Sequence, residues 1–89
     1  MKTIRQTSQF KKDVKRMQKR GKNFNEFKEI IEKLENEQKL EPKYRDHMLV
    51  GEYKGSRECH VTPNWLLIYE LTTSEIVLIR TGTHSDLFE

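Results

Sequence analysis

The chain has 89 residues, 34% hydrophobic and 35% charged, with a formal net charge of +3. We expect one domain spanning residues 1–89, with a modest core and marginal stability that a bound partner would raise. Its one cysteine, Cys59, excludes an intramolecular disulfide, and no apolar run approaches the roughly 18 residues of a membrane span. Since the N-terminus also lacks the apolar core of a signal peptide, we expect a cytoplasmic protein without a membrane partner.

The charges are unevenly distributed along the chain. Residues 1–22 contain nine Lys and Arg against one acid, Asp13, whereas residues 46–89 contain three basic and seven acidic residues. So basic a segment is typical of a surface that binds a polyanion such as nucleic acid. A solvated helix face explains the charges equally well when they are considered alone.

The N-terminal quarter predicts a strand followed by a helix. Met1–Gln6 has the composition of an edge strand, and Thr7 or Ser8 suits a helix N-cap. Three apolar residues then recur at helical spacing: Phe10, Val14 and Met17. The opposite side of this helix is cationic, with Lys11, Lys12, Lys15, Arg16, Lys19 and Arg20. Gly21 is suited to end it.

A second helix is predicted by the apolar stripe Phe27, Ile30, Ile31 and Leu34. Asn23 and Glu26 have the spacing of a capping box at its start. Because the connection between the helices is short, we expect an antiparallel helical hairpin.

The second half of the chain predicts β-structure after an irregular, charged loop at Leu40–Leu49. We expect one long strand over residues 52–62, bent at Gly55, and then a central strand at Trp65–Leu71. The last strand, Ile76–Thr83, precedes a short C-terminal turn that Asp86 is suited to cap. The order β-α-α-β-β-β predicts an α+β fold, with the helical hairpin packed on one face of an antiparallel sheet.

All three histidines, His47, His60 and His84, lie in this second half and none falls on an apolar stripe. If the helices cover the face that carries Cys59 and Val61, His60 projects from the open face, where Arg80 is also expected. Strict alternation along the last strand would instead place Arg80 on the same face as Leu78 and Gly82. A single histidine is most often structural, but three together with an arginine indicate a site.

Two imidazoles and a guanidinium suit the cleavage of RNA without a metal. A base takes the proton of the ribose 2′-OH, the oxygen attacks the phosphorus, and an acid protonates the leaving 5′ oxygen. The cation stabilises the charge that develops on the phosphoryl oxygens. Candidate stacking surfaces for a base are Tyr53, Trp65 and Phe88. No Cys or His spacing is typical of a metal site, so we expect neither a metal nor a cofactor.

Four segments of the chain carry a resemblance to a known family. They are Ser8–Lys15, Asp46–Leu49, Arg57–Tyr69 with its H-V-T-P-N-W run, and the R-T-G-T-H-S-D-L-F ending at Arg80–Phe88. Together they resemble the YafQ branch of the RelE/ParE toxin superfamily over essentially the whole chain. The resemblance implies a RelE-like fold and the toxin of a type II toxin–antitoxin pair. Such toxins are endoribonucleases that cut mRNA in the ribosomal A site without a metal, and a cognate antitoxin neutralises them.

The resemblance also implies roles for individual residues. The positions that match catalytic ones are His47, His60, Arg80, His84 and Phe88, with His47 as base and His84 as acid. Glu58 and Asn64 would support them, although the family usually has Asp in place of Asn64, and Asn cannot act as a base. Ribosomal RNA would be bound by Lys11, Lys12, Lys15, Arg16, Lys19, Arg20, Lys54 and Arg57.

The partners that the resemblance implies are an antitoxin of the DinJ or RelB type, the ribosome with its 16S rRNA, and mRNA. Two alternatives share the expected fold. One is a gyrase-directed toxin like ParE that cuts no RNA, and the other is an RNA-binding module.

Overall fold

The computed structural model describes residues 1–53 and 55–88, apart from the side chain of Glu52. Five strands form one sheet in the order β1-β5-β4-β3-β2. Their bounds are Thr3–Gln6 for β1, His47–Met48 for β2, Arg57–Thr62 for β3, Trp65–Leu71 for β4 and Glu75–Gly82 for β5. The α+β architecture is therefore as predicted, and β4 has the predicted bounds.

The sheet is mixed, not wholly antiparallel. β2, β3, β4 and β5 pair in antiparallel fashion, but β1 runs parallel to β5. A parallel pair needs a long crossover between its strands, and here the chain passes through both main helices and three other strands before it reaches β5.

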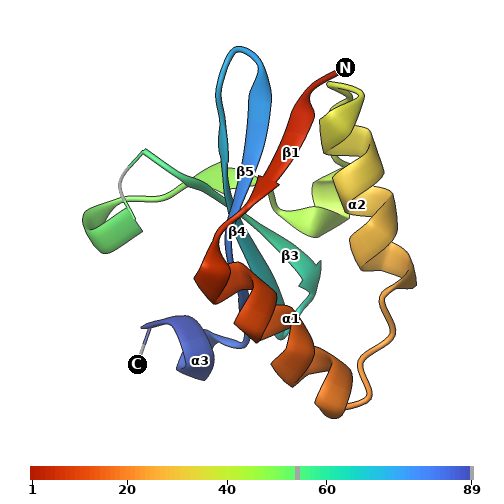
Figure 1. Cartoon of the computed structure of the whole chain (residues 1–89), viewed down its shortest axis with the longest axis vertical. Helices are drawn as coiled ribbons and strands as arrows, with labels where there is room; N and C mark the ends of the chain where they lie inside the picture. The colour runs from red at the N-terminus through yellow and green to blue at the C-terminus, as the bar shows by residue number, and fades with distance from the viewer. Residues whose placement is uncertain (54, 89) are drawn as a thin grey trace.

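The two main helices, α1 at Ser8–Lys19 and α2 at Asn25–Glu35, lie over the same face of the sheet (Figure 1). They enclose the larger core, in which Trp65 is 1% exposed and stacks on Phe27 with ring centroids 5.4 Å apart. The opposite face carries a smaller apolar cluster of Leu66, Ile68 and Leu87. Leu87 belongs to α3, the short C-terminal helix at His84–Phe88. The sheet thus has one face covered by helices and one that is only partly covered.

The predicted ends of α1 are confirmed. The Thr7 hydroxyl accepts a hydrogen bond from the Phe10 N–H at 3.0 Å, and Gly21, with φ of +74°, follows the last turn. The capping box at α2 was wrong. The N-cap position is Phe24, one residue later than expected, and it makes no side-chain capping hydrogen bond. Asn23 Oδ1 accepts from the N–H of Asn25, the first residue of the helix, at 2.9 Å. Glu26 instead accepts a hydrogen bond from the Tyr44 hydroxyl at 3.3 Å.

Two further expectations need correction. The segment predicted to be irregular contains a 3₁₀ turn, η1, at Pro42–Tyr44 and the two-residue strand β2. The long strand predicted over residues 52–62 begins only at Arg57, because Gly51–Tyr53 forms another 3₁₀ turn, η2. Lys54 lies outside the described residues. Among the helices of the described segments, none combines the length and apolar character that crossing a membrane requires.

Candidate active site

A row of cross-strand partners brings four of the predicted site residues to the partly covered face. His47 on β2 pairs with Glu58 on β3, Glu58 pairs with Ile68 on β4, and Ile68 pairs with Arg80 on β5. Directly paired residues project from the same face of a sheet, and His60 lies two residues beyond Glu58 on that face. His47, Glu58, His60 and Arg80 therefore share the face opposite α1 and α2.

Arg80 reaches this face because β5 has a bulge. Tyr69 pairs with Leu78 while Ile68 pairs with Arg80, so Ile79 is an extra residue in β5. Leu78 stays in the core beneath the helices. The expectation that Leu78 and Arg80 share a face was wrong for this reason, whereas the register agrees with the expectation that Arg80 lies on the same face as His60.

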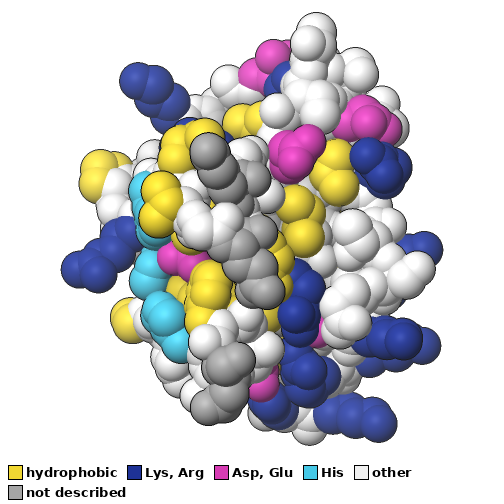
Figure 2. Space-filling model, turned by 90° about the vertical axis from the view of Figure 1, so that its left-hand side faces the viewer, with side chains coloured by type: hydrophobic (Ala, Val, Ile, Leu, Met, Phe, Trp, Pro, Cys, Tyr) yellow, Lys and Arg dark blue, Asp and Glu magenta, His cyan; other side chains and the backbone are white. Residues whose placement is uncertain are grey.

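The three imidazoles are close neighbours. The His60 ring centroid lies 6.3 Å from that of His47 and 6.0 Å from that of His84. His84 opens α3, and its ring lies 6.1 Å from that of Phe88. In Figure 2 the histidine side chains form a strip along one side of the surface, with acidic and hydrophobic side chains beside it.

Glu58 lies between two of these rings. It is 5% exposed, and its Oε1 is 3.3 Å from His47 Nε2 and 3.6 Å from His60 Nε2. On the other side of the His47 ring, Nδ1 lies 2.7 Å from the carbonyl oxygen of Arg45, which can only accept. A neutral His47 that donates from Nδ1 carries its lone pair on Nε2. If Nε2 takes up a proton, the Glu58 carboxylate beside it stabilises the resulting positive charge.

Arg80 is held by a carboxylate that the sequence did not predict as part of the site. Asp13 on α1 is fully buried and accepts from Arg80 Nε at 2.8 Å and from Arg80 Nη2 at 3.2 Å. It also accepts from Arg16, Gln9 and the Thr81 N–H. Burial alone would raise the pKa of Asp13, but the hydrogen bonds from Arg80, Gln9 and Thr81 together lower it below its usual value.

The contact forms because β1 ends opposite Leu78, so α1 lies against the edge of β5 beyond that point. Thr7 joins the two elements by donating its hydroxyl hydrogen to the Ile79 carbonyl at 2.8 Å. The one available signal in the sequence was that Asp13 is the single acid among residues 1–22.

Asp86 attaches α3 to α1. It accepts from Arg20 Nη1 at 2.7 Å and Nη2 at 3.1 Å, and from the Thr83 N–H at 2.9 Å. The Thr83 hydroxyl accepts in return from the Asp86 N–H, which confirms the predicted cap. The bond from Arg20 is the main reason that the pKa of Asp86 is held well below its usual value. This attachment fixes the helix that carries His84 and Phe88.

The aromatic candidates differ in accessibility. Phe88 is 44% exposed, and its ring meets that of Tyr53 edge to face at 5.8 Å. Trp65 is buried and donates its indole N–H to Thr81 Oγ1 at 2.7 Å, which corrects its candidacy as a stacking surface. Asn64 is exposed in the turn between β3 and β4.

Among the residues that the structure describes, the predicted RNA-binding cations fall into two groups. Arg16 and Arg20 form ion pairs with Asp13 and Asp86, and Arg57 forms a two-pronged pair with Asp46 at 3.1 and 3.2 Å. These arginines stabilise the fold. The second group is exposed on α1 and consists of Lys11, Lys12, Lys15 and Lys19. Within residues 1–53 and 55–88, no group of three or more His, Cys, Asp or Glu side chains has a geometry suited to a metal ion.

Comparison with known proteins gives close relatives over the whole chain. The mRNA interferase toxin YafQ of Escherichia coli K12 is 45% identical over 86 residues, which cover 96% of this chain and 94% of the relative. The toxin in the crystal structure of the E. coli DinJ–YafQ complex is 44% identical, with a TM-score of 0.92 and coverage of 99% and 98%. A metal-bound toxin from Helicobacter pylori is 40% identical, also with a TM-score of 0.92 and coverage of 99% and 100%.

A family profile described as the bacterial toxin of type II toxin–antitoxin systems, YafQ, matches residues 2–89. The resemblance seen in the sequence is thereby confirmed, and it extends from β1 to the end of α3. The chain belongs to the YafQ family of bacterial toxins of type II toxin–antitoxin systems.

Proposed function

We propose that this protein is an endoribonuclease that cuts mRNA on the ribosome, in the A site, and so inhibits translation in the cytoplasm. The observation that carries the proposal is the convergence of His47, Glu58, His60 and Arg80 on one sheet face beside His84. The name of the E. coli relative, an mRNA interferase toxin, supports it.

His47 is the general base in this proposal. Its Nδ1–H donates to the Arg45 carbonyl, so the lone pair on Nε2 is available to accept the proton of a ribose 2′-OH. Glu58 Oε1, 3.3 Å away, then stabilises the imidazolium that forms. His60 shares the same carboxylate and lies between His47 and His84, where it orients the substrate.

Arg80 stabilises the phosphoryl oxygens as the 2′ oxygen attacks, and His84 protonates the leaving 5′ oxygen. Phe88, half exposed beside His84, supplies a stacking surface for a base. Because each of these steps is performed by a side chain, the proposed reaction requires no metal ion. It also requires RNA, since only RNA has a 2′-OH.

The experiment compares the wild type with His84→Ala by toeprinting on ribosomes that carry a defined mRNA. We expect His84→Ala to reduce cleavage by about 100-fold or more, the usual contribution of a general acid, while its circular dichroism spectrum is unchanged. Ser85→Ala, an exposed neighbour on the same helix, is the matched control and should cleave like the wild type.

Two outcomes would count against the proposal. Full activity of His84→Ala would show that another group is the acid. A wild type that arrests growth without cutting any mRNA would favour the alternative of a gyrase-directed toxin.

An antitoxin is the second proposed partner, since the E. coli relative was crystallised with DinJ. We propose that an acidic segment of a DinJ-like antitoxin covers the exposed lysines of α1 and thereby blocks or distorts the site. Raising the salt concentration should weaken such a complex, and an affinity that is unchanged by salt would contradict this mode of binding.

A further inference from the structure

A pocket lies directly beside the histidines. It has a volume of about 360 Å³ and is bounded by α2, η1 and β3, through Glu26, Lys43, Arg45, His60, Val61 and Thr62. We call it the η1 pocket. His60 belongs both to its wall and to the candidate active site, so the pocket adjoins the site.

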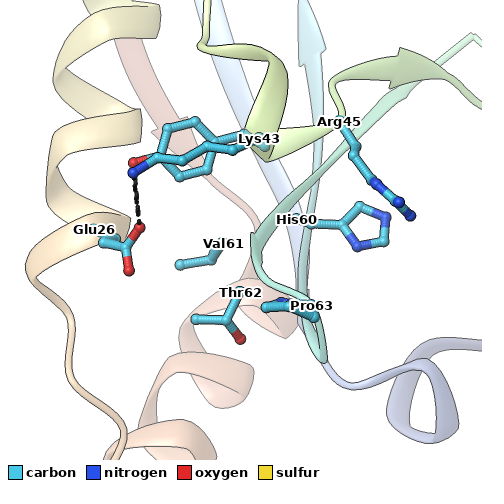
Figure 3. A pocket seen from close by; sticks show the side chains of 8 residues that line it. Glu26, Lys43, Arg45, His60, Val61, Thr62 and Pro63 are labelled. Carbon is cyan, nitrogen blue, oxygen red and sulfur yellow. Dashed lines mark hydrogen bonds and ion pairs between the residues drawn. The ribbon is translucent and has the colours of Figure 1, made fainter.

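One wall of the η1 pocket is cationic. Arg45 is exposed and lies on the same side of the pocket as His60 (Figure 3). Its backbone adopts the left-handed conformation, with φ of +50°, which is uncommon for a residue other than glycine and clusters at functional sites. The carbonyl of Arg45 also accepts the hydrogen bond from His47 Nδ1. A single turn therefore positions both His47, the proposed general base, and the Arg45 guanidinium near it.

The opposite wall combines a donor and an acceptor. Lys43 Nζ lies 3.8 Å from Glu26 Oε2, and the Tyr44 hydroxyl donates to the same oxygen at 3.3 Å (Figure 3). Both contacts use Oε2 and not Oε1. A carboxylate beside an ammonium matches the edge of a nucleobase, on which N–H donors and ring acceptors are adjacent.

We propose that the η1 pocket binds the nucleotide next to the scissile phosphate and that Glu26 influences which base is accepted there. Arg45 contacts the backbone phosphate of that nucleotide, while Glu26 accepts from an N–H on the Watson–Crick edge of its base. Single-stranded RNA is recognised in this way, by contacts to unstacked base edges. The proposal rests on the proposed function and adds a determinant of sequence preference to it.

The first experiment maps cleavage sites in ribosome-bound mRNAs by sequencing the new 5′ ends. We expect Glu26→Gln to change the base preference at one position beside the cut, because the amide replaces one acceptor oxygen by a donor. Glu29→Gln, one turn further along α2 and outside the pocket, should retain the wild-type pattern. A pattern for Glu26→Gln that equals the wild-type pattern would overturn the proposal.

The second experiment separates this proposal from the proposed function. It titrates a single-stranded oligoribonucleotide of mixed sequence into the His84→Ala variant and follows the backbone amides by NMR. We expect shifts at residues 43–45 and 60–62, and about fivefold weaker binding when Arg45→Ala is added. Absence of shifts at these residues would overturn the subsite even if the enzyme proves to cut mRNA. Their presence would support the subsite even if the wild type cuts none.

Discussion

Arg80 depends on a residue far from it in sequence. Asp13 donates nothing and accepts from five nitrogen atoms, two of them in the Arg80 guanidinium. The hydrogen bonding of Arg80 to the Asp13 carboxylate is the main reason that the pKa of Arg80 is raised above its usual value. The carboxylate therefore fixes the direction of the guanidinium that is proposed to contact the phosphate.

Replacing Asp13 should affect stability and cleavage together. Removal of one partner from a buried ion pair costs roughly 3–5 kcal/mol, so Asp13→Ala should lower the free energy of unfolding by at least about 3 kcal/mol. Asp13→Asn keeps the shape but loses the charge, and we expect it to fold while cleaving at least about tenfold more slowly. Urea unfolding and cleavage assays well below the melting temperature measure the two effects.

Gln9→Ala is the control, because it removes one neutral contact of Asp13 and leaves both contacts to Arg80 in place. Cleavage by Asp13→Asn at the wild-type rate would mean that Arg80 keeps its position without the buried charge.

At the residue scale, the sequence predicted the residues that are proposed to carry the chemistry better than those that orient them. The histidines and Arg80 were recognisable from residue type and from the family motifs. Asp13 and Arg45 were not, because their importance depends on where α1 and η1 pack in three dimensions. Nothing in the residue types distinguished Arg16, which pairs with Asp13, from the exposed Lys15 beside it.

The element that positions the site is the end of β5 with α3. The bulge turns Arg80 to the open face, and the chain then passes Gly82 into α3 within two residues. A Cβ at Gly82 would lie 2.9 Å from Asp86 Oδ2 and 3.0 Å from Asp86 Cβ. The close approach of this backbone to Asp86 thus allows α3 to fold back against α1.

Gly82→Ala should therefore displace α3, with His84 and Phe88 on it. We expect a loss of roughly 1–3 kcal/mol in stability from the overlap and a fall in cleavage of about tenfold or more from the misplaced His84. Thermal unfolding and the toeprinting assay test the two effects.

Gly21→Ala is the matched control. Gly82 has φ of +156°, and Gly21→Ala likewise places alanine at a positive φ, +74°, but a Cβ at Gly21 has no neighbour within 4 Å. It should lower stability by about 1 kcal/mol and leave cleavage per folded molecule unchanged. Equal losses of cleavage in the two variants would show that the position of α3 does not matter.

At the element scale, the strongly patterned segments were the predictable ones. The bounds of β4 were predictable from its continuous apolar run, and α1 was predictable from its apolar stripe. In both segments the buried positions recur at the spacing of the secondary structure. The two-residue strand β2 and the bulge in β5 have no such repetition. Both exist only through the register of a neighbouring strand, which a single segment does not encode.

Over the whole molecule, the positively charged residues of α1 take two different positions in the fold. The arginines of α1 turn toward Asp13 and Asp86, which join α1 to β5 and α3. The lysines of the same helix face solvent. The charge asymmetry was visible in the sequence, but its division into structural arginines and accessible lysines required the tertiary structure.

The accessible lysines give the last prediction. If α1 docks on ribosomal RNA, replacing Lys11, Lys15 and Lys19 by Gln should weaken ribosome binding and reduce its dependence on salt. Each lost phosphate contact reduces the magnitude of the negative slope of log K against log salt by about 0.7–0.9, so the loss of three contacts reduces it by roughly 2–3. Binding measured by sedimentation with 70S ribosomes over a range of salt concentrations gives this slope.

A second triple variant, with Lys28, Lys33 and Lys39 replaced by Gln, has the same change in net charge in and just beyond α2. Its slope should remain close to that of the wild type, because long-range attraction alone is weak beyond the roughly 8–10 Å screening length at physiological salt. Equal slopes for the two variants would mean that net charge, and not a docking surface on α1, brings the protein to the ribosome. A lower slope for the α1 variant alone would identify this helix as the contact with ribosomal RNA.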